Sequence, residues 1–302
     1  MRVLDADAVA ALGPAAAVRA VVDALRGGLD PAADPPRVRV GLDGGEFLLM
    51  PSEAAAAAGV KVVTVAPGNR ARGLPRIQGV HLLFDQETLT PRAVLDGAAL
   101  TALRTPAVSV AAVLGRLPER PLRVVALGAG PQATGHVAAL AAVRPLERAT
   151  HLVRDPSHAA LDAVRLGTPP AEAALRSADV VVCATGARSP LFDSALLRPD
   201  AVVVAVGAHE PDARELDAAL LGRATVVVED VATALREAGD VVLAVAEGAV
   251  TPEDLVSLRD VVTGVVTVPA DRPLVFKSVG MSWQDLVVAA AVLQHTNAQH
   301  ES

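Results

Sequence analysis

The 302-residue sequence is short of several residue types, and each shortage narrows what the protein can be. It contains one cysteine, Cys183, which excludes an intramolecular disulfide and any zinc site built from several cysteines. Cys183 lies in the apolar run at residues 180–184, so we expect a small buried core residue rather than a nucleophile. Tyrosine is absent and aromatic residues make up 2% of the chain, so a reductase mechanism that relies on a tyrosine proton donor cannot operate here.

Long apolar runs and clusters of positive charge are missing as well. Hydrophobic residues make up 52% of the chain, but no uncharged stretch reaches the ~18–20 residues that would span a bilayer. Arg2, Asp5 and Asp7 precede a broken alanine-rich run, which lacks the order of a signal peptide. The formal net charge is −7 and lysine and arginine are not gathered in runs, which argues against nucleic-acid binding. We therefore expect a soluble, cytoplasmic protein without membrane or nucleic-acid partners.

The sequence does contain a glycine turn between a strand pattern and a helix pattern. An apolar run at residues 124–127 leads into Gly128, Ala129, Gly130, Pro131, Gln132 and Ala133. Gly128 permits the tight turn, Gly130 lets the backbone approach a pyrophosphate, and Ala133 is the small residue where the helix packs against the strand. The start of that helix offers N–H groups and a partial positive charge to phosphates. The segment predicts a bound dinucleotide.

A regular alternation of strands and helices follows the glycine turn. We predict strands at residues 149–153, 179–184, 201–206 and 224–228, and helices after Asp155, from Asp193, and at 216–221. Strands that are each followed by one crossover imply a parallel sheet with right-handed connections. In such a sheet ligands bind at the carboxyl ends of the strands, where Gly130, Arg154, Thr185 and Gly207 fall. Val206, at the end of its strand, is also predicted to bind the cofactor.

The residues after the second strand bear on the choice of cofactor. An acidic side chain at this place usually holds the ribose of NAD, whereas an arginine accommodates the extra phosphate of NADP. Asp155 followed by Pro156 is typical of an N-cap with proline at the first helical position, which leaves Arg154 nearest the ribose. We therefore favour NADP, and an arginine stacked on the adenine of NAD is the alternative.

The first half of the chain and its last stretch read differently. We predict one or two helices in residues 1–30, strands at 38–40, 47–50, 60–65, 79–85 and 93–95, and helices at 52–59 and from 100 to 117. The length favours two domains, with a linker at 118–121. Residues 274–293 predict a strand, a glycine turn and a helix that cross back to complete the first domain instead of adding to the sheet.

Two basic residues are out of place in this first half. Lys61 stands in a β-branched run, where burying an ammonium without a partner is costly, so it is either a site lysine in a cleft or a snorkelling edge-strand lysine. Arg104 is expected in the first turns of a helix, where a cation is unfavourable. We therefore expect Arg104 to meet an anion.

The order of the motifs along the chain resembles the ornithine cyclodeaminase/mu-crystallin family from about Pro35 to Leu293. The motifs are Pro36-Arg37, Met50-Pro51, Lys61, Pro67-Gly68-Asn69, Asp96-Gly97, Leu103-Arg104-Thr105, the glycine turn, Arg214-Glu215-Leu216-Asp217, Glu237-Ala238-Gly239-Asp240 and Phe276-Lys277-Ser278-Val279-Gly280. The resemblance implies an α/β fold in which a Rossmann NAD(P)-binding domain, residues 118–277, is inserted in an α+β substrate-binding and dimerisation domain, residues 1–117 plus 278–302. It also implies a nicotinamide cofactor and a homodimer.

The resemblance assigns expected roles to individual residues. Arg37, Lys61 and Arg104 match the cationic substrate-site residues of the family, Ser278 lies near the nicotinamide, and Arg154 matches the arginine of NADP-using members. His209 departs from the pattern, because the cyclodeaminases carry an aspartate at that place. The departure favours the mu-crystallin/ketimine reductase branch. His209 is a second proton-handling candidate, and a solvent-exposed loop histidine is the alternative.

Together these observations predict an NAD(P)H-dependent oxidoreductase that reduces the C=N bond of a small imino acid, or oxidises an amino acid in reverse. Arg37 and Arg104 would hold the substrate carboxylate in charge-assisted hydrogen bonds, and Lys61 would orient the substrate or deliver a proton. No metal is expected. An amino-acid cyclodeaminase and a non-catalytic NAD(P)H-binding protein are the alternatives.

Overall fold

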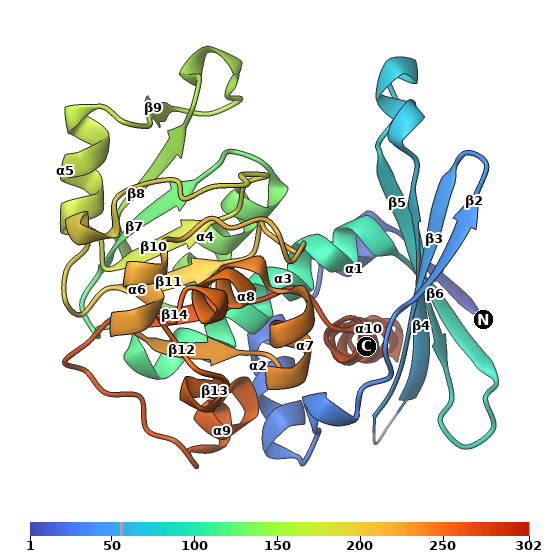
Figure 1. Cartoon of the computed structure of the whole chain (residues 1–302). Coiled ribbons are helices and arrows are strands. Elements are labelled where there is room, and N and C mark those ends of the chain that lie inside the picture. The colour runs from blue at the N-terminus through green and yellow to red at the C-terminus, as the bar shows by residue number, and fades with distance from the viewer. Residues whose placement is uncertain (55–56, 302) are drawn as a thin grey trace. The chain divides into compact units, whose positions relative to one another are not determined.

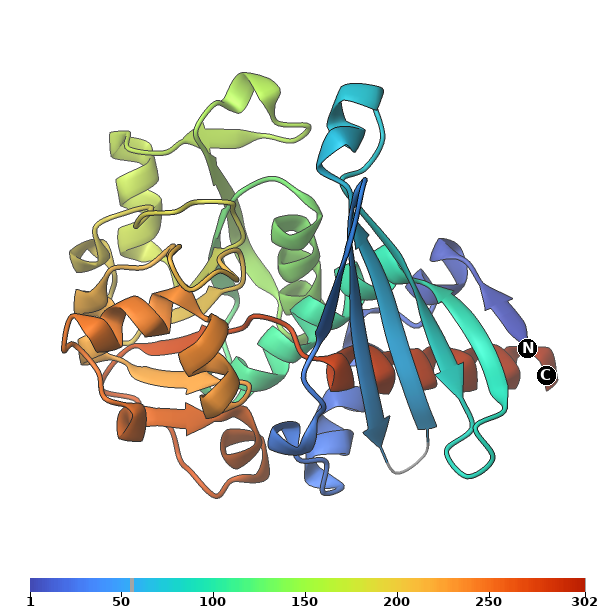
Figure 2. The ribbon, with the colours of Figure 1, turned by 45° about the vertical axis from the view of Figure 1, so that its right-hand side comes forward.

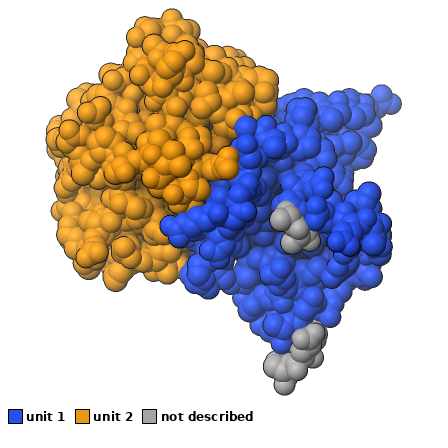
Figure 3. Space-filling model, turned by 90° about the horizontal axis from the view of Figure 1, so that it is seen from below, with its two compact units in different colours: residues 1–108, 280–302 blue, residues 109–279 orange. Residues whose placement is uncertain are grey.

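The computed structural model describes residues 1–54 and 57–301. The chain forms two compact units (Figure 3). Unit 1 comprises Met1–Val108 and Gly280–Ser302, and unit 2 comprises Ser109–Val279. The unit boundaries thus fall at residues 108 and 279, beside the domain boundaries at 117 and 277 expected from the sequence.

Unit 1 is built on a six-stranded sheet with the order β1-β6-β5-β4-β3-β2 (Figure 1). Its strands are β1 (Arg2–Leu4), β2 (Val38–Leu42), β3 (Gly45–Ala54), β4 (Ala57–Val65), β5 (Ile77–Phe84) and β6 (Pro91–Asp96). The pairs are antiparallel except β1 with β6. Burial alternates along β4, so the sheet has an inner and an outer face.

Helix α10 (Ser282–Glu301) lies along the inner face of this sheet, where it contacts β3, β4 and β5 (Figure 2). The other helices that begin in unit 1 are α1 (Ala6–Ala10), α2 (Pro14–Arg26) and α3 (Gly97–Val113). The register places Met50, Lys61, His81 and Leu95 in one buried row across four strands of this face. Lys61 and His81 are therefore set among apolar side chains.

Unit 2 contains an eight-stranded sheet with the order β13-β12-β14-β11-β10-β7-β8-β9, in which every pairing is parallel. The strands are β7 (Leu122–Leu127), β8 (Leu146–Val153), β9 (Ala163–Arg165), β10 (Val180–Cys183), β11 (Val202–Ala205), β12 (Thr225–Val228), β13 (Leu255–Ser257) and β14 (Leu274–Lys277). The helices are α4 (Pro131–Val143), α5 (Pro169–Ser177), α6 (Ala218–Arg223), α7 (Val231–Glu237), α8 (Gly239–Ala246) and α9 (Leu258–Thr263). The predicted α/β class and parallel sheet are confirmed.

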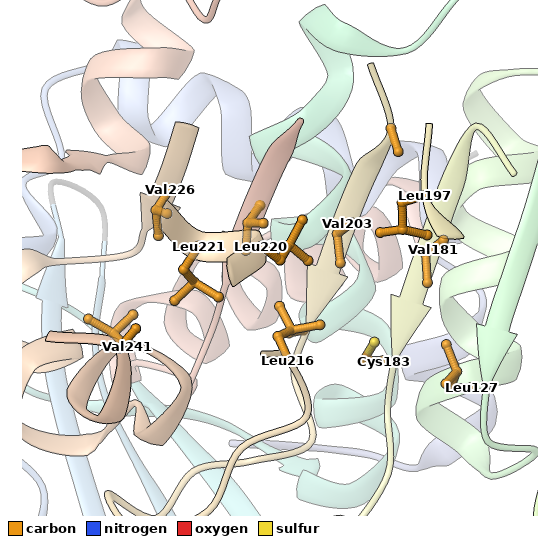
Figure 4. Packing of buried hydrophobic residues seen from close by; sticks show 14 of the residues in the cluster. Leu127, Val181, Cys183, Leu197, Val203, Leu216, Leu220, Leu221, Val226 and Val241 are labelled. Atoms are coloured by element: carbon orange, nitrogen blue, oxygen red, sulfur yellow. The ribbon is translucent and has the colours of Figure 1, made fainter. Parts of the chain in front are cut away.

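The core of unit 2 explains why its strands read as unbroken apolar runs. Strands β10, β11 and β14 are buried along their whole length, as in a sheet covered on both faces. Figure 4 shows Cys183 among Leu127, Val181 and Leu216 in this core. Burial raises the pKa of the Cys183 thiol well above its usual value, so its predicted role as a core residue is confirmed.

Several predicted elements are wrong in this structure. The helix expected at 52–59 is a pair of strands, because β3 runs to Ala54 and β4 begins at Ala57; residues 55–56 of that prediction lie outside the described residues. Cross-strand pairing here overrides the helix propensity of alanine. The helices expected after Asp155 and from Asp193 are single 3-10 turns, Pro156–His158 and Ser194–Leu196.

Both ends of unit 1 also differ from the prediction. The chain opens with strand β1 before helices α1 and α2. Strand β14 lies between β11 and β12 in the sheet of unit 2, so the expectation that residues 274–277 leave this sheet is wrong. The helix after it, α10, does return to unit 1.

One helical stretch of the described residues, Gly97–Arg116, is long and apolar enough to cross a bilayer. Of its most apolar window, 67% is buried inside the protein, as in the core helix of a water-soluble fold.

Candidate active site

Lys61 is the centre of a polar cluster inside unit 1. It stands on β4, between β3 and β5, so the edge-strand alternative is excluded. The side chain is 5% exposed and its Nζ lies 3.0 Å from Asp285 Oδ1. The ammonium also donates to Thr101 Oγ1. The carboxylate from α10 therefore offsets the cost of burying the charged lysine in the sheet.

Arg104 reaches the same carboxylate from α3. Its Nε lies 3.3 Å from Asp285 Oδ1, and its Nη1 donates to Gln284 Oε1 at 2.5 Å. Because α3 begins at Gly97, Arg104 is in its third turn, and the expected conflict with the helix N-terminus does not exist. Arg104 does meet an anion, but that anion is a side chain of the protein.

Gly280 closes the cluster at the turn before α10. Its φ is +78°, and a Cβ there would lie 2.9 Å from both terminal nitrogens of Arg104, so this position requires glycine. The carbonyl oxygen of Gly280 accepts a hydrogen bond from Arg37 Nη2 at 2.5 Å. Three predicted substrate-site residues, Arg37, Lys61 and Arg104, are thus brought together in unit 1.

The charges of this cluster do not balance. Burial lowers the pKa of Lys61, Arg104 and Arg37 lower it further, and Asp285 opposes them. Burial pushes the pKa of Asp285 upward, but Arg104 and Lys61 outweigh it and hold that pKa below its usual value. Two buried cations, Lys61 and Arg104, therefore share one oxygen of Asp285, with Arg37 near Lys61. Asp34 is a further carboxylate in this region, and burial, with the charge of Asp285, raises its pKa. Such an excess of positive charge suits an anionic ligand, a carboxylate above all.

The sequence interpretation missed four residues of this cluster: Thr101, Gln284, His81 and Asp285. Two of them carried a signal of the kind that marked Lys61. Asp285 precedes the apolar run at 286–293, and His81 interrupts an apolar strand. A polar side chain on a buried face needs a partner, and each of these residues could have been questioned on that ground.

His209 lies in unit 2, on an exposed loop after β11. Its Nδ1 is 3.2 Å from the carbonyl oxygen of Gly207. Its part in proton transfer stays a prediction.

The glycine turn of unit 2 has the geometry that a phosphate site needs. Gly128 has a φ of +110°, and a Cβ there would lie 2.9 Å from the carbonyl oxygen of Ala184. Ala133 is fully buried, and its Cβ would be 3.7 Å from that of a substituted Gly128, so α4 packs closely on the turn. Gly130 is the N-cap of α4, and a Cβ placed on it would meet no described atom within 4 Å. A side chain here would occupy the space in which a phosphate could approach the helix N-terminus.

A pocket of about 450 Å³ lies beside this turn, at the carboxyl ends of β7 and β8 and after β10. Gly128, Arg154, Asp155, His158 and Thr185 are among its lining residues. The chain passes from β7 to β8 on one side and to β10 on the other, so the strand order reverses at β7. Dinucleotides bind at such switch points, and the residues present fit one.

Asp155 is the N-cap that the sequence predicts, with a proline at the first position of a short 3-10 helix. Asp155 accepts the backbone N–H of Ser157 and pairs with Arg165 and His158, so its carboxylate is occupied by the local turn. Arg154 is exposed at the pocket. Arg154 is thus the side chain that stays exposed at the pocket, and its place beside the ribose of a dinucleotide stays a prediction.

A buried network ties the strand ends beneath the pocket together. Glu215 accepts hydrogen bonds from the backbone N–H and hydroxyl of Thr185, both at 2.8 Å, and from the N–H of Gly207 at 2.7 Å. Ser278 donates to Glu229 at 2.6 Å. Thr185 and Ser278, both predicted cofactor residues, are thus held by carboxylates of the network, and Val206 is held by a backbone bond to Cys183.

Lys277 completes this network. Its Nζ lies 2.8 Å from Asp240 Oδ2, an ion pair without hydrogen-bond alignment, and it also donates to the carbonyl oxygen of Ala208. Asp240 Oδ1 accepts the N–H groups of Glu215 and Leu216. Across residues 1–54 and 57–301, no three His, Cys, Asp or Glu side chains gather as a metal site would require.

Comparison with known proteins agrees with this geometry. A sequence model described as the ornithine cyclodeaminase/mu-crystallin family matches residues 8–300. The chain is 36% identical over 268 residues to Delta(1)-pyrroline-2-carboxylate reductase 2 of Burkholderia ambifaria, covering 83% of this chain and 81% of that protein.

Two solved structures share the whole fold. Delta(1)-pyrroline-2-carboxylate reductase of Thermococcus litoralis, in complex with NADH and L-proline, is similar with a TM-score of 0.86 and 26% identity, over 99% of this chain and 98% of that one. An archaeal alanine dehydrogenase dimer with bound NAD is similar with a TM-score of 0.86 and 28% identity, over 99% of this chain and 97% of that one.

Proposed function

The chain belongs to the ornithine cyclodeaminase/mu-crystallin family, and on this premise we propose that it is an NAD(P)H-dependent oxidoreductase that reduces the C=N bond of a small imino acid. Delta(1)-pyrroline-2-carboxylate, a five-membered cyclic imino acid, is the substrate that the relatives favour. The observation that carries the proposal is the buried cluster in unit 1, in which Lys61 and Arg104 both face one oxygen of Asp285.

The substrate carboxylate is the anion that this cluster lacks. Arg37 and Arg104 present planar guanidinium groups, which hold a carboxylate through paired, charge-assisted hydrogen bonds. Fixing the carboxylate fixes the imino carbon next to it. Orientation of this kind contributes up to ~7–11 kcal/mol to the lowering of a barrier.

Lys61 is the proton donor in this proposal. Reduction of C=N adds hydride to carbon and a proton to nitrogen, so an acid has to supply that proton. The lowered pKa of Lys61 makes its ammonium a stronger acid than an exposed lysine, and Asp285 keeps the group in place. Lys61 loses its proton to the substrate nitrogen and regains one from water before the next turnover.

NAD(P)H, when bound, supplies the hydride. In our proposal, residues 128–133 of unit 2 hold its pyrophosphate at the N-terminus of α4. Thr185, Val206 and Ser278 complete the walls of the cofactor site. Arg154 holds the 2′-phosphate of NADP, because Asp155 is already paired within its own turn.

The deciding experiment follows NADPH and NADH oxidation by absorbance with Delta(1)-pyrroline-2-carboxylate, its six-membered homologue, and 2-oxo acids with ammonia or methylamine. We expect consumption with a cyclic imino acid and a lower KM for NADPH than for NADH. Silence with every substrate, while NADPH still binds, would contradict the reductase. A lower KM for NADH would show that the role given to Arg154 is wrong.

The cofactor site has its own test. Gly130→Ala places a methyl group in open space, so the fold is unaffected, but the phosphate meets a Cβ. We expect the Kd for NADPH to rise about tenfold or more. Gly115→Ala is the matched control, since its Cβ also meets no described atom within 4 Å, and it leaves the Kd unchanged. An unchanged Kd for NADPH in Gly130→Ala would show that the pyrophosphate does not bind at the N-terminus of α4.

We also propose a homodimer. The outer face of the sheet in unit 1 carries an apolar row across four paired strands, Val38, Leu49, Val62 and Val80, of which Val38 is 49% and Val80 is 40% exposed. Contiguous apolar surface of this kind usually marks an interface. The similar archaeal alanine dehydrogenase is a dimer. Light scattering of the purified protein tests the homodimer, because it measures the molar mass in solution, and the mass of a single chain would contradict it.

The cytoplasmic location stays a prediction.

A further inference from the structure

His81 is a titratable residue of the cluster in unit 1 to which the proposed reaction assigns no part. It stands on β5 directly opposite Lys61 on β4, so both side chains leave the sheet on the inner face. The imidazole is fully buried. The backbone of β4 confines it, because a Cβ on Gly59 would lie 2.7 Å from His81 Nε2 and 2.9 Å from Leu286 Cδ1. The ring is therefore fixed at the floor of the cluster.

Two neighbouring groups in this cluster, the ring of His81 and one oxygen of Asp285, have hydrogen-bonding atoms that the described residues leave unused. Neither ring nitrogen of His81 has a hydrogen-bond partner among the residues that the structure describes. The same holds for Asp285 Oδ2, whereas Asp285 Oδ1 takes both Lys61 and Arg104. Buried polar atoms in proteins are nearly always paired. A donor on one side and an acceptor on the other are left over within a single cluster.

The protonation states of the two groups suit each other. Burial lowers the pKa of His81 to about 4, Asp285 opposes this shift, and Lys61 adds to it. The ring is therefore neutral at pH 7 and carries one N–H. Asp285 is held ionised by its cations, so its second oxygen is an acceptor. Each group shifts the pKa of the other, as near neighbours do.

We propose that His81 is a positioning residue of the active site, whose ring N–H donates to Asp285 Oδ2 through one buried water. The bond fixes the rotation of the carboxylate, so that Oδ1 alone faces Lys61 and Arg104. His81 thereby acts on the substrate only through the direction in which Lys61 points. This inference rests on the proposed function for its kinetic consequences, whereas the hydrogen bond itself does not depend on it.

Two substitutions separate this role from mere packing. His81→Leu fills the same buried space without a donor, and His81→Gln keeps an N–H donor on a flexible chain. We expect kcat of His81→Leu to fall on the order of 10–100-fold with the KM for NADPH unchanged, and His81→Gln to recover most of the loss. His295→Leu is the control, because it makes the same change on α10 at a histidine that pairs only with Gln299 in the described part of the chain, and it leaves kcat unchanged.

The pH profile supplies a readout that packing alone would not move. A carboxylate that loses a hydrogen-bond donor titrates at a higher pKa, so the acidic limb of kcat in His81→Leu shifts to higher pH. Lys61 on β4, Arg104 on α3 and His81 on β5 face Asp285, with Arg37 near Lys61. Asp34, before β2, also interacts with Asp285, and burial together with the charge of Asp285 raises the pKa of Asp34. Only His81 differs between the variants.

Nitrogen-15 NMR of the imidazole tests the bond without turnover. We expect one slowly exchanging ring N–H at pH 7, identified by its loss in His81→Leu, and a change in its shift in Asp285→Asn. Wild-type kcat and an unmoved acidic limb in a folded His81→Leu, or a folded His81→Gln as slow as His81→Leu, would overturn the proposal. If the wild type itself reduces no imino acid, the proposed function fails, and the NMR signal alone decides whether the bond exists.

Discussion

Each of the two units buries a lysine against an aspartate, and the two pairs are completed differently. Lys61 and Asp285 are 3.0 Å apart in unit 1, and Lys277 and Asp240 are 2.8 Å apart in unit 2. In unit 2, backbone groups complete the pair: Asp240 accepts two N–H groups, and Lys277 donates to a carbonyl oxygen.

In unit 1, by contrast, Arg104 shares with Lys61 the single oxygen Asp285 Oδ1. Within the described part of the chain, the second carboxylate oxygen lacks an aligned hydrogen bond in both pairs, so the difference between them lies in the charges. A pair whose carboxylate also binds backbone N–H groups holds strands together, whereas a pair with surplus positive charge is prepared for a ligand.

The largest expected effect is the loss of activity when Lys61, the lysine of unit 1, is replaced. Lys61→Met keeps the aliphatic stem but removes the proton donor, so kcat/KM for the imino acid falls about 10²–10⁴-fold. The Kd for NADPH, measured by fluorescence titration, stays at the wild-type value. Turnover that persists in Lys61→Met would show that another group donates the proton, and the proposed difference between a catalytic Lys61 and a structural Lys277 would then be wrong.

Stability separates them in the opposite sense. Lys277→Met leaves Asp240 charged and buried without its cation, which costs about 3–5 kcal/mol of unfolding free energy. Lys61→Met loses less, because Arg104 still neutralises Asp285. Urea unfolding of both variants tests this order. Equal urea midpoints for Lys277→Met and Lys61→Met would contradict this order and show that the Lys277–Asp240 pair stabilises the fold no more than the Lys61–Asp285 pair does.

Asp179 extends the comparison to a third buried carboxylate, in unit 2. Burial pushes its pKa upward, but Arg120 and the backbone N–H and side chain of Arg123 outweigh it and hold the pKa at about 2. Since this pKa lies below the ordinary 3.8, Asp179 stabilises the fold above pH 3.8, and the contribution is lost as pH falls from 3.8 towards 2. Asp179→Asn should lose roughly 2 kcal/mol at pH 7. A constant difference from wild type down to pH 2 would refute the assignment.

The smallest effect concerns the pH dependence of the unit 1 pair. The pKa of Lys61 lies below the 10.5 of a free lysine, so kcat falls on the alkaline side at a pH lower than 10.5. The same shift costs stability at pH 7, and this cost disappears as pH rises towards 10.5. Lys61→Arg, which stays protonated, loses the alkaline limb. A limb that survives in Lys61→Arg belongs to another group.

Local signals predicted most of unit 2. The turn at Gly128 is fixed by a backbone angle that only glycine adopts readily, and the neighbouring strands are buried on both faces, so their apolar runs are legible. The failures came where pairing decides conformation. The mostly small residues at 52–54 and 57–59 predict a helix, but each of them pairs with a residue on the neighbouring strand. In the same way, β14 enters the sheet between β11 and β12, two strands that precede it in sequence.

The site of unit 1 was predicted only in part, for a related reason. Lys61 could be suspected because its charge contradicts its neighbours, and that contradiction is local. Its partner is 224 positions away, and no spacing rule connects the two. The prediction for Arg104 rests in part on a conflict with a helix end that the structure does not contain. A single histidine in a strand, such as His81, gives no indication of its partner until the opposite strand is known.

The distance along the chain between Lys61 and Asp285 also sets a timetable for synthesis. A ribosome that adds ~5–20 residues per second reaches Asp285 roughly 10–45 s after Lys61. During that interval β3, β4 and β5 exist without α10, the helix that contacts all three, while the whole of Ser109–Val279 emerges. The nascent chain therefore contains the whole sequence of its nucleotide-binding half before the lysine of the other half has acquired its counter-ion. A chain that ends shortly before residue 285 would, once released from the ribosome, hold every strand of unit 2 but leave the inner sheet face of unit 1 without its helix.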